Sequence, residues 1–133
     1  MIVEAKLLQK IEEHLDEIVQ IAEKCVTATK AADADLEESQ LRNLQNLASA
    51  TDSVPVLENF IAYQMGRKKL PVEVGQQILN DIRELGRKAE EFVRDNREAL
   101  RWARMELIRL YLGFLVRKFV AVVADRKKTE ERP

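Results

Sequence analysis

Apolar residues recur every three or four positions along nearly the whole chain, and this period restricts the fold most strongly. The clearest run begins at Leu8 and ends at Cys25, with six apolar residues separated by steps of 3, 4, 3, 4 and 3. This heptad spacing lays one side of a helix along a partner helix, whereas a half-buried strand would alternate polar and apolar residues. Because no such alternation is visible in the sequence, it predicts an all-α fold.

The same pattern divides the 133 residues into a single-domain bundle of about five helices, with long first and last helices. Residues 1–30 should hold an acidic heptad helix, and residues 39–126 a helical core. Residues 127–133 are predicted to form a disordered tail. The expected helices cover residues 2–30, about 39–50, about 55–66, 72–94 and 96–126.

Local signals support the boundaries inside the core. Ser53 can cap a helix, and Pro55 and Pro71 fit the first turn, where a missing N–H is unsatisfied anyway. Gly75 and Gly86 lie on one stripe of the fourth helix, and glycine inside a helix costs about 1 kcal/mol relative to alanine. We therefore expect another backbone to approach that stripe closely. The last helix carries two apolar stripes, so it should be central or shared with a partner.

Charge is distributed unevenly although the formal net charge is only −1. Residues 1–38 carry 10 acidic and 4 basic side chains, whereas residues 96–133 carry 5 acidic and 10 basic ones. Opposite ends of two copies could therefore attract each other, and self-association is expected. A single cysteine excludes an internal disulfide and favours a reducing cytoplasm. The most apolar stretch is too short to span a bilayer, so no membrane role is expected.

The residues needed for common catalytic chemistry are missing from the sequence. There is no glycine-rich phosphate loop, and one histidine, His14, cannot supply the repeated Glu-x-x-His pattern of a di-metal bundle. Cys25 lies on the heptad stripe and is interpreted as packing, and Trp102 as core or interface. We expect no enzyme activity, no metal and no cofactor.

Basic side chains are the remaining functional candidates, and they favour contact with a nucleic-acid backbone. The basic triplet Arg67, Lys68 and Lys69 ends a predicted helix, where one or two cations would already complement the helix dipole. Because no exposed aromatic pattern is expected beside these charges, base stacking and sequence readout are not predicted. The candidate RNA-binding residues are Gln40, Arg42, Arg67, Lys68, Lys69, Arg87 and Lys88. The face shared by Arg97, Arg101 and Arg104 is as well explained by pairing with acids such as Glu98.

Three short motifs resemble, in order and spacing, the small subunit of type III-A CRISPR interference complexes, the Csm small subunit. They are residues 38–44 (ESQLRNL), residues 62–67 (AYQMGR) and residues 105–112 (MELIRLYL). In the third motif an acidic residue lies within an apolar run before a tyrosine. The resemblance covers residues 38–120. The first motif contains Gln40 and Arg42, and the second ends at Arg67, which adjoins Lys68 and Lys69.

The resemblance implies an all-helical, non-catalytic subunit of an antiviral-defence ribonucleoprotein. In that family, copies stack beside the guide-bearing subunits and hold the duplex of guide and target RNA through basic side chains. The implied partners are the other subunits of a type III complex and the backbones of the guide and target RNA. The long acidic helix at residues 2–30 departs from the family pattern. The alternative function is a helical adaptor or homo-oligomerisation module, in which the stripe from Leu8 to Cys25 would dimerise.

Overall fold

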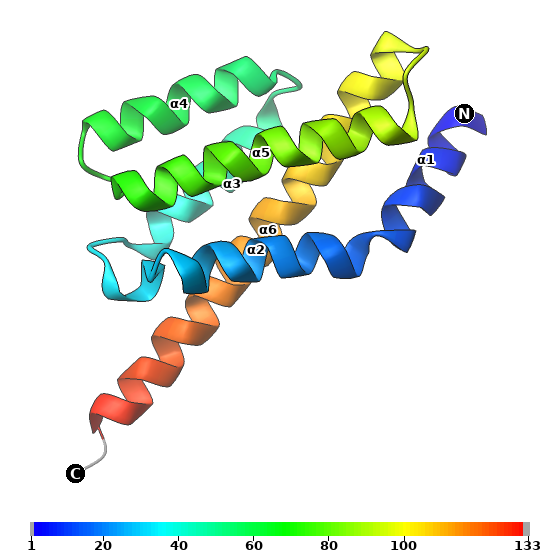
Figure 1. The fold of residues 1–133 in the computed structure, drawn as a ribbon. Helices are drawn as coiled ribbons and strands as arrows, with labels where there is room; N and C mark the ends of the chain where they lie inside the picture. Colours follow the sequence, from blue (N-terminus) through cyan, green and yellow to red (C-terminus); the bar gives the residue numbers. More distant parts are fainter. Residues whose placement is uncertain (1, 132–133) are drawn as a thin grey trace.

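The structure is a computed structural model that describes the backbone of residues 2–131 and the side chains of residues 4–130. All regular structure in this part of the chain is helical (Figure 1). The elements are α1 (Ile2–Glu13), α2 (Leu15–Ala28), the 3₁₀ turn η1 (Ala31–Asp33), α3 (Glu38–Ala50), α4 (Val54–Gly66), α5 (Val72–Phe92) and α6 (Arg97–Glu131). The all-α prediction is confirmed, with six α-helices in place of about five.

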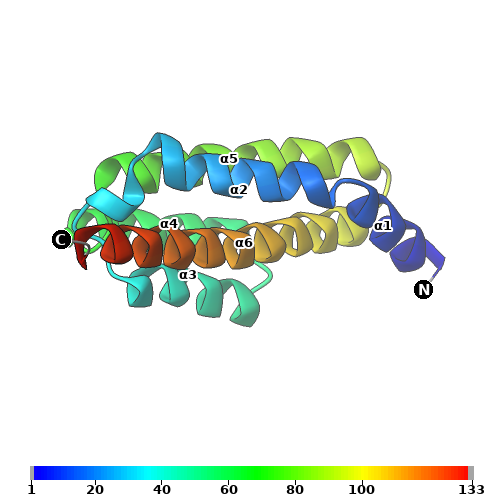
Figure 2. The same cartoon turned by 90° about the horizontal axis from the view of Figure 1, so that it is seen from below.

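The long helix α6 forms the centre of the bundle. Figure 2 shows α2 and α5 on one side of α6 and α3 on the opposite side, and each of the three packs directly against it. Side chains around most of its circumference are therefore buried, including Met105, Ile108, Tyr111 and Leu112. This arrangement confirms the central role expected from two apolar stripes on one helix. Helix α4 completes the bundle by packing on α3 and α5.

The predicted long first helix is wrong, because the chain breaks at His14. Its backbone leaves the helical region (φ −109°, ψ 8°), and ring atom Nδ1 lies 2.8 Å from the carbonyl oxygen of Lys10. The ring also packs against Phe92 of α5, with centroids 4.9 Å apart, so His14 is half-buried. Contact with α5 thus compensates for the interrupted helix.

The break also changes which residues of the heptad stripe are buried. Ile11, Ile18 and Cys25 face the core, whereas Leu8 is 51% exposed. Helix α2 lies against α6, so most of the stripe packs within one chain and not against a second copy. Only α1 keeps a large apolar side chain of the stripe in solvent.

The two glycines of α5 differ in their surroundings. At Gly75 a β-carbon would overlap the side chain of Met65 from α4, so this position does require glycine unless Met65 moves. At Gly86 the nearest atom to such a carbon would be Nε of Arg104, at 3.7 Å. The expected close backbone approach is therefore wrong at both sites: a side chain covers Gly75, and Gly86 has room.

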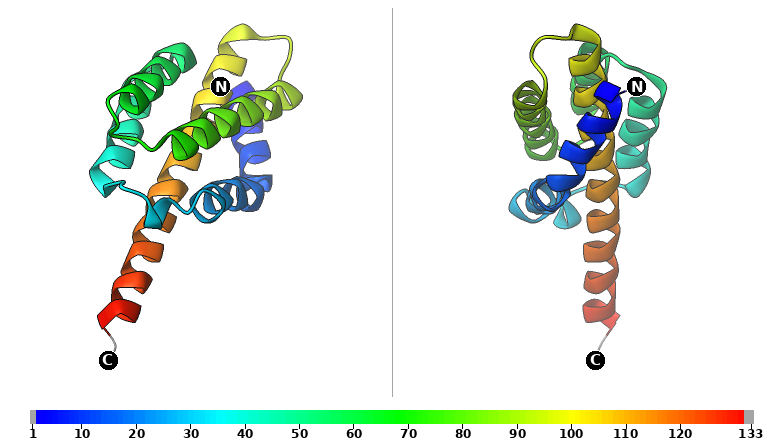
Figure 3. Two further views of the ribbon diagram at one scale, coloured as in Figure 1. Left: turned by 60° about the vertical axis from the view of Figure 1, so that its left-hand side comes forward. Right: turned by 90° about the vertical axis from the view of Figure 1, so that its right-hand side faces the viewer.

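The C-terminal end of α6 extends past the other helices (Figure 3). The helix continues to Glu131, so residues 127–131 are helical and not disordered as predicted, while residues 132–133 lie outside the described residues. Phe119 is the last buried residue, and side chains from 124 to 130 are exposed. At its other end, α6 is capped by Asn96, whose Oδ1 accepts from the Ala99 amide at 3.0 Å.

Candidate nucleic-acid interface

The turn between α4 and α5 presents the basic triplet. Lys68 adopts a left-handed backbone conformation (φ 62°) directly after the helix end. The amide of Lys69 donates to the carbonyl of Gln64 at 2.9 Å, and that of Lys68 donates to Met65 at 3.0 Å. This pair of bonds is a Schellman motif, in which glycine usually occupies the left-handed position. The motif turns the chain sharply and leaves three consecutive cations at a corner of the molecule.

All three side chains of the triplet are exposed, and none forms an ion pair among the residues with described side chains. The guanidinium of Arg67 lies 5.3 Å from the centroid of the Tyr63 ring, and Tyr63 is 54% exposed. The sequence predicted no exposed aromatic pattern beside the charges, and the structure places one exposed aromatic side chain at this corner. Tyr63 offers one ring face beside a cation, which is a stacking geometry used with nucleic-acid bases.

Gln40 is brought to the same corner from the start of α3. Together with Lys68 and Lys69 it lines a small pocket of about 160 Å³, whose remaining lining residues are the acids Asp35 and Glu37. Its Oε1 is buried and has no hydrogen-bond partner within the described part of the chain. The two acids reduce the local positive potential, so the cations project from a mixed rim and not from a uniformly basic surface.

The other predicted residues are engaged elsewhere. Arg42 forms an ion pair with Glu38 one turn earlier in α3. Arg87 pairs with Glu84 at 2.6 Å, and Lys88 reaches Glu17 of α2 at 2.6 Å with only 11% of its side chain exposed. Both lie about four turns along α5 from the corner, roughly 22 Å at 1.5 Å per residue. The structure thus brings together Gln40, Arg67, Lys68 and Lys69, and leaves Arg87 and Lys88 apart.

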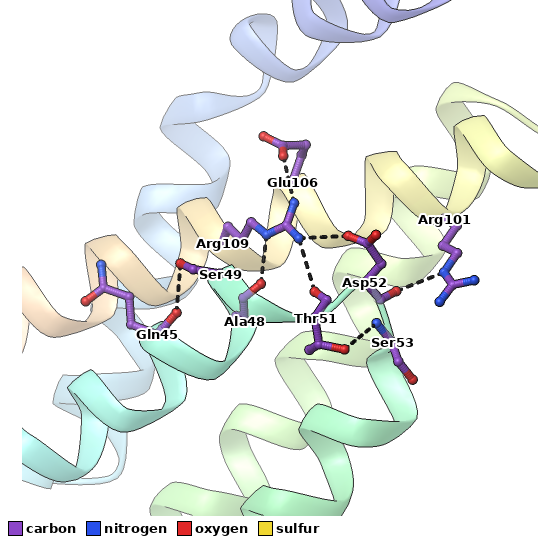
Figure 4. A network of polar contacts seen from close by, with 9 residues as sticks. All are labelled: Gln45, Ala48, Ser49, Thr51, Asp52, Ser53, Arg101, Glu106 and Arg109. Atoms are coloured by element: carbon purple, nitrogen blue, oxygen red, sulfur yellow. Dashed lines mark hydrogen bonds and ion pairs between the residues drawn. The ribbon is translucent and has the colours of Figure 1, made fainter.

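A second polar feature, centred on Arg109, was not anticipated from the sequence. Its Nε donates to the Ala48 carbonyl at 2.8 Å and its Nη2 to the Thr51 carbonyl at 3.1 Å (Figure 4). The same guanidinium pairs with Asp52 at 3.0 Å and with Glu106 at 2.9 Å. One arginine of α6 therefore satisfies carbonyls at the end of α3 that have no partner within the helix.

A buried polar cluster lies between α2, α5 and α6. The Tyr111 hydroxyl donates to Asp81 at 2.6 Å, and the Gln77 amide donates to the other carboxylate oxygen at 2.9 Å. Burial raises the pKa of Asp81 above its ordinary value, although the hydrogen bonds from Tyr111 and Gln77 oppose the shift. Burial also raises the pKa of the neighbouring Cys25 to about 12. A thiol held protonated in this way is a poor nucleophile, in agreement with a packing role.

Residues that could hold a metal ion do not gather within the described chain, where no group of three or more histidine, cysteine or acidic side chains is found. No described helix combines the length and the apolar character needed to cross a membrane. No family model, curated protein or solved structure matches the chain.

Proposed function

We propose that this chain binds the phosphate backbone of RNA without reading its sequence, through the corner formed by Arg67, Lys68 and Lys69 with Gln40. One observation carries the proposal: three consecutive, exposed cations without ion-pair partners among the described residues project from a single sharp turn. Phosphate contacts of this kind give affinity and orientation but no sequence information.

The motif resemblance extends this proposal to a biological setting. We propose a non-catalytic small subunit of a type III CRISPR effector complex that contacts guide and target RNA in antiviral defence. The cytoplasm, the other subunits of such a complex and a second copy of the chain are its proposed location and partners. Co-purification with large partner proteins and a short RNA would support this setting, whereas isolation of the chain alone would oppose it.

The left-handed backbone of Lys68 supports a role for its charge in phosphate contact. A non-glycine residue in the left-handed region costs roughly 1–2 kcal/mol. Glycine at this position would recover much of that free energy but would remove the central cation. Lys30 takes the same conformation (φ 53°) after α2, and no lysine or arginine adjoins it in the sequence. It therefore provides a matched control that separates backbone strain from charge.

The first experiment measures binding of a fluorescent single-stranded RNA by anisotropy at several salt concentrations. The native chain should bind with a dissociation constant of roughly 10⁻⁴–10⁻⁶ M, the usual range for non-specific contacts at physiological salt. Substituting Arg67, Lys68 and Lys69 together by glutamate should abolish binding. The control substitutes Arg126, Lys127 and Lys128 by glutamate, which makes the same charge change at the far end of α6, where Arg126 is paired with Asp33. Equal losses in both triple variants, with both folded by circular dichroism, would refute the site.

Two single substitutions sharpen this test. Lys68→Gly and Lys30→Gly should each raise the free energy of unfolding by about 1 kcal/mol, because both relieve left-handed strain. Only Lys68→Gly should also weaken RNA binding and lower the salt dependence, by about 0.7 in the log–log slope for one phosphate contact. Unchanged RNA affinity in Lys68→Gly would show that the central cation makes no contact.

One observation favours the adaptor function as the second candidate, namely the exposed Leu8 on α1. In that case light scattering should detect a dimer that Leu8→Glu dissociates, and no RNA binding should be seen at low salt. Salt also separates the two kinds of self-association. A charge-driven contact weakens as salt rises, because charges are screened within about 10 Å at 0.1 M, whereas an apolar contact does not.

A further inference from the structure

A pocket lies between the α3–α4 loop and the first turns of α6, at the opposite end of α4 from the basic corner. It has a volume of about 640 Å³, within the range of roughly 300–1,000 Å³ that is typical of small-molecule sites. Val54, Pro55 and Leu100 supply an apolar wall. Three arginines at positions 97, 101 and 104 supply the polar side, because their spacing of 4 and 3 puts them on one face of α6.

Hydrogen bonding leaves two of these arginines available for an anion. Arg104 is already paired with Glu90 at 2.7 Å. Arg101 donates its Nε to the Asp52 carbonyl at 3.0 Å (Figure 4), and its two terminal nitrogens form no hydrogen bond or ion pair with the described residues. Arg97 makes neither a hydrogen bond nor an ion pair with any other residue whose side chain is described. The bond to the Asp52 carbonyl fixes the direction of the Arg101 guanidinium before any ligand arrives.

The side chains that line the pocket include three arginines and two acids. The Asp52 carboxylate is paired with Arg109, which it shares with Glu106. Glu98 lines the pocket but forms no ion pair within the described residues. The lining therefore carries one more positive than negative formal charge, and Arg97 and Arg101 are its two arginines without an ion pair among the described residues.

The amino end of α4 contributes little to this charge. The Ser53 hydroxyl accepts the Val56 amide at 3.3 Å, and Pro55 has no N–H to offer. Anion recognition in the pocket therefore depends on arginine side chains. A planar guanidinium with two free nitrogens matches the oxygens of a phosphate group better than a lysine would.

We propose that this pocket binds a nucleotide. Arg97 and Arg101 hold the phosphate, and the nucleoside packs on Val54, Pro55 and Leu100. The nucleotide is either free in solution or one residue of an RNA strand, since both present a phosphate ester beside the flat face of a base. The site is independent of the basic corner, so either proposal can fail while the other stands.

The test is an NMR titration of the ¹⁵N-labelled full chain with adenosine 5′-monophosphate, adenosine and inorganic phosphate in parallel. The monophosphate should shift the Arg101 Nε–H and Val54 amide signals at concentrations where adenosine does not. Arg101→Gln should weaken this binding by about tenfold or more, as expected when a hydrogen bond to a charged group is lost. The matched control, Arg117→Gln, removes an exposed arginine of the same helix outside the pocket and should change nothing.

Each outcome bears on the proposal. Absence of shifts at the pocket, equal weakening by Arg117→Gln, or equal affinity for inorganic phosphate and the monophosphate would each overturn it. If Arg101→Gln fails to fold, Arg97→Gln replaces it, because Arg97 has no intramolecular bond to lose among the described residues. A single-stranded RNA distinguishes the two sources. Unchanged RNA affinity in the variant assigns a free nucleotide, and loss of RNA and monophosphate binding together assigns a nucleotide within the strand. Loss of RNA binding without monophosphate shifts overturns the pocket.

Discussion

Replacing Arg109 by leucine should lower the free energy of unfolding by about 3 kcal/mol, because one side chain joins α6 to the end of α3. Leucine and arginine have similar helix propensities, so the helix itself should be unaffected. The variant loses the bonds to the Ala48 and Thr51 carbonyls at 2.8 and 3.1 Å. Hydrogen bonds to a charged group contribute about 1.5–3 kcal/mol each.

The estimate lies near the lower end of that sum for a structural reason. The Arg109 side chain is 26% exposed, so water can reach part of the site in the variant. Asp52 is 73% exposed, and an ion pair with such a residue contributes no more than about 1 kcal/mol. The loss should therefore persist in 1 M salt, since carbonyl bonds and not ion pairs supply most of it.

Urea denaturation followed by circular dichroism would measure the effect, together with thermal unfolding. At about 4 °C per kcal/mol for a chain of this size, the midpoint should fall by roughly 12 °C. Arg117→Leu is the matched control, because Arg117 lies over Phe114 at 5.6 Å and is exposed. It should lose less than about 1 kcal/mol. Similar small losses in both variants would contradict this prediction and show that water serves the α3 carbonyls as well as Arg109 does.

Two further predictions concern α5. Gly86→Ala should raise the free energy of unfolding by about 1 kcal/mol in urea titrations, because the site is helical and has room for a methyl group. Gly75→Ala should gain less, since Met65 must move, and an equal gain at both positions would contradict the packing. Burial raises the pKa of Asp81 in the folded state, so its contribution to stability is largest below the ordinary value of 3.8 and is lost as pH rises through the folded pKa. Asp81→Asn should therefore gain stability relative to the native chain as pH increases from 4 to 7, and a pH-independent difference between the two would exclude the charge of Asp81 as the cause.

Periodicity predicted the all-helical class and a last helix that is central or shared with a partner, and capping residues and prolines predicted most helix boundaries inside the core. These features depend on neighbouring residues or on apolar spacing. Burial of an apolar stripe stabilises such a helix in almost any helical bundle. Part of the candidate site could also be predicted from the sequence. The basic triplet follows a helix and precedes Pro71, so its exposure at a turn could be expected from neighbouring residues.

Other features depended on contacts between residues far apart in the sequence. The break at His14 arises where its ring meets Phe92, and nothing in the heptad spacing of residues 8–25 indicates it. The sequence predicted Lys88 to be an RNA-binding cation, but in the folded chain Glu17 of α2 is paired with it. Pairing of this kind cannot be deduced from sequence spacing, because it depends on how two helices are placed side by side.

The helices, their apolar faces and the identity of the cations thus follow from the amino-acid sequence. Which cations remain without an ion-pair partner depends on how the helices pack. Arg87, Lys88 and Arg104 are paired with acids within the chain, whereas the triplet at residues 67–69 and the pocket arginines Arg97 and Arg101 form no ion pair among the described residues. Ion pairs form only between charges a few ångströms apart, and distances on that scale are defined only once the helices are packed together.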